Sequence, residues 1–102
     1  MYGLKSSDLK IICRLFKEYS NIEEAVLFGS RAKGSHLPGS DVDIALKGSD
    51  LQEAILRMSI FLNQESLLPY YFDIVDYNSL DNKNLIDHID RVGISIYKKE
   101  TA

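Results

Sequence analysis

Apolar residues recur at three- and four-residue spacing in three parts of the chain, which predicts three amphipathic helices. They span about residues 7–19, 51–64 and 79–92. The sequence Ser49-Asp50-Leu51-Gln52 matches a capping box before the second helix, and Ser79 is positioned to cap the third. Gly93 supplies a stop for the last helix.

Short apolar or alternating runs between these helices predict four strands, at residues 24–28, 41–46, 70–76 and 94–97. A glycine-rich loop covers residues 29–40 and has room for one helical turn at 30–33. The expected fold is a two-layer α+β domain, in which helices pack on one face of a small mixed sheet. Residues 1–102 are expected to form a single domain, because the chain has room for only one core.

Composition narrows the class of protein. The chain is 45 % hydrophobic and 26 % charged, which is ordinary for a folded soluble protein. Its formal net charge of −3 disfavours an extended nucleic-acid-binding surface, which needs many basic residues. No stretch is apolar enough to suggest a membrane helix or a signal peptide. Cys13, the one cysteine, is expected to be a buried, inert thiol, which is consistent with a reducing cytoplasm.

Asp41 and Asp43 are the first candidates for chemistry. They are two residues apart on a predicted strand, so both carboxylates point to one face. Their repulsion is tolerable if one is protonated, if cations pair with them or if a divalent metal lies between them. Oxygen ligands of this kind suit Mg²⁺, with Mn²⁺ as a substitute, and such sites often include substrate phosphates.

A candidate phosphate cradle precedes this pair. Gly29 ends the first predicted strand and lets the backbone approach a phosphate, while the hydroxyl of Ser30 is a donor at the start of a helical turn. Arg31 adds positive charge nearby. Phosphate cradle and carboxylates together are the parts of two-metal phosphoryl transfer.

Asp73 is the third candidate carboxylate. It lies between two apolar residues of the predicted strand 70–76 and therefore projects to the opposite face from them. If this strand lies beside the strand of Asp43, Asp73 completes the metal site and helps to take a proton from an attacking hydroxyl. His88, in the last helix, is interpreted as one half of a surface ion pair.

Each feature alone has an ordinary explanation: a Gly-Ser pair is usually a turn, and an Asp-x-Asp usually faces solvent. Their combination is more specific, because Gly29-Ser30 is followed by ten residues and then by Asp41-Val42-Asp43. This pattern resembles the signature of the polymerase-β-like nucleotidyltransferase superfamily. The strings at 27–34 and 40–45 look like its minimal nucleotidyltransferase branch.

The resemblance implies a polymerase-β-like core with two Mg²⁺ ions held by Asp41, Asp43 and Asp73. It also implies that Gly29 and Ser30, assisted by Arg31, hold a nucleoside triphosphate, most simply ATP. In this branch the partner is commonly a separate helical HEPN protein, and many such pairs resemble a toxin and its antitoxin. The nucleotidyltransferase then adds AMP to a tyrosine of the HEPN protein.

Three functions remain open at this stage. The first is an enzyme that transfers a nucleotide to a hydroxyl of a protein or small molecule. The second is a non-catalytic module that neutralises a HEPN partner by contact, and the third is a metal-binding or generic α+β domain. Self-association is left open as well. For any partner chain, the apolar stripes within 51–62 and 85–97 are the expected contact surfaces.

Overall fold

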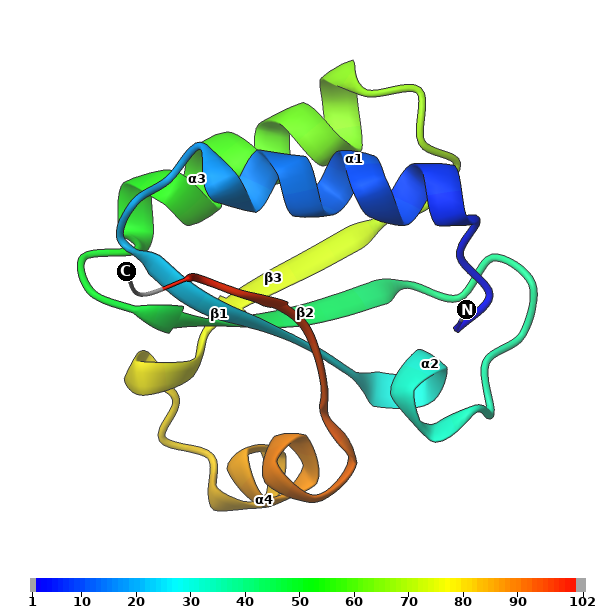
Figure 1. Ribbon diagram of the computed structural model, residues 1–102. Coiled ribbons are helices and arrows are strands. Elements are labelled where there is room, and N and C mark those ends of the chain that lie inside the picture. Colours follow the sequence, from blue (N-terminus) through cyan, green and yellow to red (C-terminus); the bar gives the residue numbers. More distant parts are fainter. Residues whose placement is uncertain (1, 101–102) are drawn as a thin grey trace.

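A four-stranded mixed sheet forms the centre of the protein in the computed structural model, which describes residues 2–100 (Figure 1). The order across the sheet is β3-β2-β1-β4. β1 runs antiparallel to both β2 and β4, whereas β2 and β3 are parallel and are joined by a helical crossover. The strands are β1 (Ile22–Phe28), β2 (Val42–Gly48), β3 (Phe72–Asp76) and β4 (Ile94–Lys98).

The helices alternate with these strands in the order expected from the sequence, and the α+β fold class is confirmed. They are α1 (Ser6–Lys17), α2 (Gly29–Lys33), α3 (Gln52–Ile60), which continues as the π-helical turn η1 (Phe61–Glu65), the 3₁₀ turn η2 (Tyr77–Ser79) and α4 (Lys83–Val92). Within residues 2–100, no helix has the length and apolar character needed to cross a membrane.

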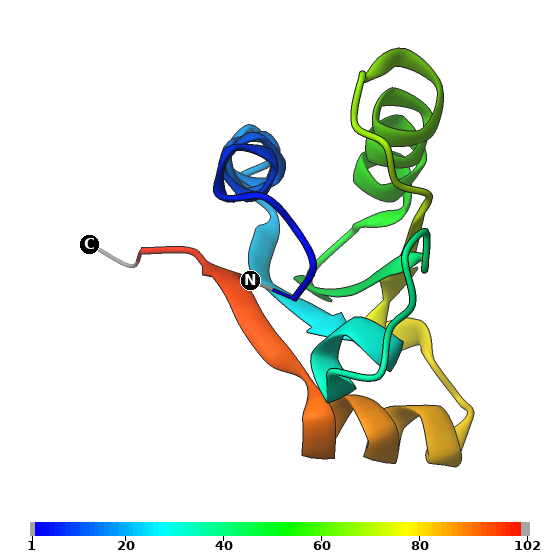
Figure 2. The same cartoon turned by 90° about the vertical axis from the view of Figure 1, so that its right-hand side faces the viewer.

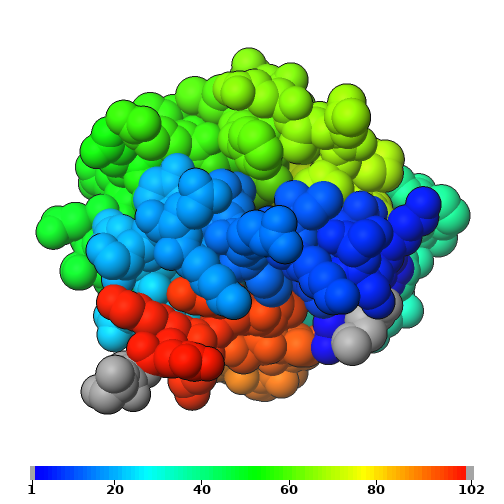
Figure 3. Space-filling model, turned by 45° about the horizontal axis from the view of Figure 1, so that its top comes forward, coloured from blue at the N-terminus to red at the C-terminus, as the bar shows by residue number. Residues whose placement is uncertain are grey.

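The main core lies between the sheet and the pair formed by α1 and α3. Phe16 of α1 and Met58 of α3 are fully buried against Leu27, Ile44 and Phe72 of the three neighbouring strands. Seen from outside, α1 and α3 with η1 lie side by side over this face (Figure 3). Burial of these large side chains is the principal source of the stability of the fold.

A second, smaller core occupies the opposite face of the sheet, where α4 packs (Figure 2). It contains Val26 and Phe28 of β1, Ala45 of β2 and Ile89 of α4. The expectation that helices cover a single face is therefore wrong for α4. The reason is that β1 and β2 carry apolar side chains on both faces, so each face needs a cover.

The start of α3 differs from the predicted capping box. Leu51 occupies the cap position with a helical backbone, and no side chain caps the helix. Asp50 instead adopts a left-handed conformation with φ of 52°. The side-chain amide of Asn21 donates to the carbonyls of Ser49 and Asp50. This contact from a distant part of the chain fixes the turn before α3 but does not cap the helix, because an N-cap accepts from the first helical amides.

The last helix also starts later than predicted. Ser79 lies in η2, where its hydroxyl donates to Asp76. The cap of α4 is Asn82, whose side-chain oxygen accepts hydrogen bonds from the amides of Asn84 and Leu85. Asn is as good an N-cap as Ser, so the local sequence offered two starting points and packing of α4 selected the second.

Cys13 is only partly buried, which corrects the expectation of a fully buried thiol. Its Sγ donates a hydrogen bond to the carbonyl of Ile96, which ties α1 to β4. Burial raises the pKa of the thiol, and the nearby charge of Lys17 opposes this effect. Because the thiolate is the reactive form, this environment keeps Cys13 unreactive, as the sequence predicts.

The second core can be tested by truncating Ile89, which is 2 % exposed. Ile89→Ala should lower the free energy of unfolding by about 2–5 kcal/mol, since it leaves a cavity beneath α4. Leu56→Ala is the matched control because Leu56 lies in α3 and is 61 % exposed. It should change stability by less than about 0.5 kcal/mol in urea denaturation. Equal effects of the two substitutions would contradict the packing of α4 described here.

Candidate functional site

The register of the sheet places Asp43 between two other candidate positions. Asp43 pairs with Phe28 of β1 on one side and with Asp73 of β3 on the other. Their apolar neighbours along the strands, such as Ile44 and Phe72, are buried against α1 and α3. By strand alternation, Asp43 and Asp73 both project to the face that carries α4. The structure therefore brings these two carboxylates to one place.

Asp41 lies just before β2 and is exposed, whereas Asp43 is half-buried. The pKa of Asp43 is raised from 3.8 to about 6, first by burial and then by the negative charges of Asp73 and Asp41. The positive charge of Arg31 acts in the opposite direction. The charges of Asp41 and Asp73 therefore act on Asp43, which lies close enough to both to feel their repulsion.

Gly29 is required for the close approach of β1 and Asp43. Its φ is +75°, a conformation that favours glycine, and a Cβ at this position would collide with Oδ2 of Asp43. The glycine therefore does two things at once. It permits the sharp turn from β1 into α2, and it leaves space for the carboxylate of Asp43.

Ser30 follows in the first turn of α2 and is half-buried beside this position. Its carbonyl accepts a hydrogen bond from the amide of Ser35, which closes the short helix. Among the hydrogen bonds formed within residues 2–100, none involves the Ser30 hydroxyl. The predicted helical turn is present, and the serine side chain is available to an external acceptor.

The sequence suggested that Arg31 helps to hold a phosphate, but its guanidinium lies in the protein interior. It is 3 % exposed, and its guanidinium donates to the carbonyls of Ser40 and Tyr2 while lying over the ring of Tyr70, 5.3 Å from the centroid. These bonds fix the loop that leads into Asp41. The guanidinium in this structure is used by the protein itself, so Arg31 acts on the site through its charge and through this loop.

His88 is a residue that the sequence interpretation missed. Its Nε2 accepts a hydrogen bond from the backbone N–H of Gly29, at 3.0 Å. Its ring also meets Phe28 edge to face, with centroids 6.2 Å apart. The expected surface ion pair is therefore wrong: the acid nearby in α4, Asp87, pairs with Arg91 instead. No local pattern indicated the contact, because it joins residues 59 positions apart.

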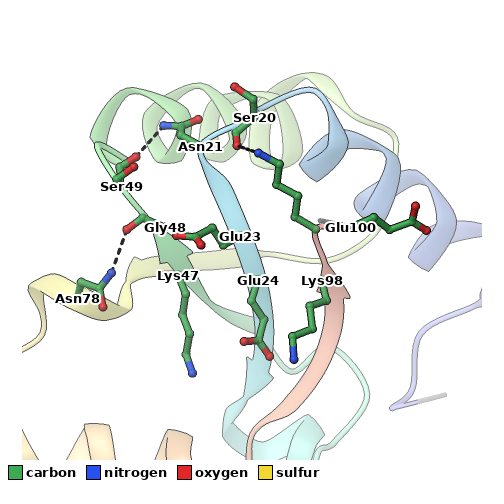
Figure 4. Close-up of a pocket in the computed structure, with 11 residues that line it drawn as sticks. Ser20, Asn21, Glu23, Glu24, Lys47, Gly48, Ser49, Asn78, Lys98 and Glu100 are labelled. Carbon is green, nitrogen blue, oxygen red and sulfur yellow. Dashed lines mark hydrogen bonds between the residues drawn. The ribbon is translucent and has the colours of Figure 1, made fainter. Parts of the chain in front are cut away.

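A hollow of about 1070 Å³ lies at the other end of the sheet, away from these carboxylates (Figure 4). Lys47, Glu24 and Lys98 come from three neighbouring strands and point the same way into it. Positive and negative side chains alternate across the strands, so this hollow has no dominant charge. It contains none of the candidate residues Asp41, Asp43 and Asp73.

The carboxylates have the chemistry of a site for a divalent metal. Their oxygen atoms are the ligands that Mg²⁺ prefers, and burial together with the charges of Asp73 and Asp41 raises the pKa of Asp43. Among residues 2–100, however, no three acidic, histidine or cysteine side chains form a complete metal cluster. The chemistry of the donors fits, and oxygen atoms of a phosphate ligand are needed to complete the coordination of an ion.

A glycine-serine turn beside paired aspartates, on a small mixed sheet, defines a nucleotidyltransferase type of domain. Residues 10–102 match the family described as Polymerase beta, Nucleotidyltransferase, and the chain belongs to this family. The comparison with curated proteins yields no match.

Several solved structures share the fold. One is a toxin–antitoxin complex with AMP-PNP, with a TM-score of 0.74, 24 % identity and coverage of 91 % of this chain and 75 % of that chain. A variant of the toxin–antitoxin MntA–HepT has a TM-score of 0.71 and 26 % identity, with coverage of 96 % and 76 %. The MNT antitoxin in complex with a tri-AMPylated HEPN toxin of Shewanella oneidensis has a TM-score of 0.66 and 22 % identity, with coverage of 89 % and 70 %. These similarities support the minimal nucleotidyltransferase branch.

Gly29→Ala tests the close approach to Asp43, with Gly34→Ala as its control. Both glycines have positive φ, but a Cβ at Gly34 meets open space. Gly34→Ala should therefore cost about 1–2 kcal/mol of folding stability from backbone strain alone. Gly29→Ala should cost a further 1–3 kcal/mol, roughly, because the carboxylate must move. Chemical denaturation measures both, and equal losses would contradict the steric argument.

The pH dependence of stability tests the crowding around Asp43. Its folded-state pKa of about 6 exceeds the ordinary 3.8, so the folded protein holds the proton longer than the unfolded chain. Without divalent metal, stability should therefore fall as pH rises from 3.8 to about 6. Asp43→Asn should remove about 1 kcal/mol of this loss, after allowance for solvent screening. If the intact chain and Asp43→Asn lose the same stability across this pH range, the raised pKa of Asp43 would be contradicted.

Proposed function

We propose that this chain is a minimal nucleotidyltransferase domain that transfers AMP from ATP to a hydroxyl group, with a tyrosine of a HEPN protein as the acceptor. The observation that carries the proposal is the pairing of Asp43 with both Phe28 and Asp73. This register puts the turn at Gly29 and the carboxylates within one small region. Membership of the nucleotidyltransferase family supports the same reaction class.

In the proposed site, the turn formed by Gly29 and Ser30 holds the triphosphate: Gly29 provides the backbone bend and Ser30 the donors. Asp41, Asp43 and Asp73 are the metal ligands. Two Mg²⁺ ions, when bound, neutralise the phosphate charge and polarise the reacting phosphorus centre. Arg31 is assigned a positioning role, since its guanidinium holds the carbonyl of Ser40 next to Asp41.

The proposed reaction is a nucleotidyl transfer with pyrophosphate as the leaving group. The oxygen of the acceptor hydroxyl forms a bond to the α-phosphorus of ATP, and the bond between that phosphorus and the bridging oxygen of pyrophosphate breaks. The products are an AMP ester of the acceptor and pyrophosphate. We assign to Asp73, which is exposed on the edge strand β3, the role of taking the proton of the attacking hydroxyl.

A protein partner is supported by an apolar surface on the solvent side of α3 and η1. Leu56 is 61 % exposed, and Ile60 and Phe61 next to it are also exposed. These residues belong to the stripe at 51–62 that the sequence singled out. The stripe at 85–97, by contrast, presents no large exposed apolar side chain within the described residues. We propose that the surface on α3 and η1 contacts the HEPN partner.

The enzymatic proposal is tested with labelled ATP, Mg²⁺ and a purified HEPN partner. The intact chain should label the partner, whereas Asp41→Asn, Asp43→Asn and Asp73→Asn should each reduce labelling at least about 100-fold, because each removes a metal ligand. Asp81→Asn is the control, since Asp81 is exposed just before α4 and lies outside the site. It should label like the intact chain.

The same variants separate the alternative functions. Neutralisation of the HEPN partner that survives Asp41→Asn and Asp43→Asn would favour a non-catalytic antitoxin that acts by contact alone. Absence of metal-dependent ATP binding by the intact chain would leave a generic α+β domain and would overturn the enzymatic proposal.

A further inference from the structure

We propose that His88 is a positioning residue that holds the phosphate-binding turn through the backbone amide of Gly29. This inference rests on the proposed function, because it concerns how the turn binds ATP. It adds a residue from α4 to a site otherwise built from β1, α2, β2 and β3. It also assigns different tasks to the two amides of the Gly29-Ser30 pair.

The contact that carries the inference is specific in both distance and direction. The N–H of Gly29 donates to Nε2 of His88 at 3.0 Å, a good length for this type of bond. The imidazole is held in place by its edge-to-face contact with Phe28, at an interplanar angle of 78°. The next residue of α4, Ile89, is buried in the second core and anchors the helix.

This geometry fixes the state of the imidazole. A nitrogen that accepts a hydrogen bond carries no proton, so Nε2 is unprotonated and Nδ1 carries the proton of the neutral ring. A backbone amide has only one hydrogen to donate. While His88 accepts it, the Gly29 amide is not available to a phosphate oxygen.

Two consequences follow for the turn. The triphosphate is held by the amide and hydroxyl of Ser30, since the Gly29 amide is already paired. The bond to His88 also fixes the peptide that leads from Phe28 into Gly29, which is the peptide that must bend sharply past Asp43. His88 therefore keeps the turn in the geometry that binds phosphate before any ligand arrives.

Two substitutions of His88 test the position of the acceptor atom, because both introduce a polar amide side chain and only one of them can reach Gly29. In His88→Gln, the amide oxygen lies the same number of bonds from Cα as Nε2 and can accept from Gly29. In His88→Asn, the oxygen is one bond too short. Titration with ATP and Mg²⁺ should show binding about three- to tenfold weaker for His88→Asn than for the intact chain, which is the loss expected for one hydrogen bond. His88→Gln should stay within about twofold.

A second measurement detects the hydrogen bond between Gly29 and His88 directly and requires neither ligand nor activity. Nitrogen-15 NMR should find His88 in the tautomer with the proton on Nδ1, and hydrogen exchange should find the Gly29 amide protected. The protection should be lost in His88→Asn and kept in His88→Gln. Thermal unfolding of both variants identifies any general loss of structure.

The outcomes separate this inference from the proposed function. Equal ATP affinity in both variants and the intact chain, or equal weakening in both variants, would overturn the positioning role. If the intact chain binds no ATP, the proposed function fails. Hydrogen exchange of the Gly29 amide then still tests whether His88 bonds to this amide. An unprotected Gly29 amide in the intact chain would overturn the inference directly.

Discussion

The close approach of negative charges at Asp43 is the constraint on which the rest of the site depends. Hydrogen bonding between strands fixes Asp43 opposite both the end of β1 and Asp73, so the carboxylates cannot move apart without breaking the sheet. The buried side chains on the other face of the same strands hold that register. The hydrophobic core therefore maintains an arrangement that electrostatics alone would oppose.

The protein tolerates this arrangement by several separate means. The raised pKa of Asp43 lets one carboxyl keep its proton part of the time at neutral pH. Arg31 supplies positive charge from a buried position, where its guanidinium donates to the backbone carbonyls of Tyr2 and Ser40. A pair of divalent ions with a triphosphate would relieve the same repulsion, and for this reason the charge crowding supports the proposed nucleotidyl transfer.

The second core gives α4 a role beyond covering the sheet. Ile89 anchors the helix on Val26, Phe28 and Ala45, and the preceding residue then reaches the amide of Gly29. Stability and site geometry are thus coupled through adjacent residues of one helix. The hollow of alternating charges lies at the other end of the sheet, and no residue of α4 lines it.

Strand alternation and helical periodicity are local properties, so the sequence alone predicted the elements and the α+β class. It also predicts a shared face for Asp41 and Asp43, of which Asp41 lies just before β2. It also identified Gly29, since a glycine between a buried strand and a polar turn indicates special backbone geometry. Long-range packing set the rest: α4 covers the second face, Asn21 holds the turn before α3, and Arg31 and His88 bond to distant backbone groups. Each of these depends on segments far apart along the chain, whose approach is set by packing of the whole core and leaves no periodic signal in the sequence.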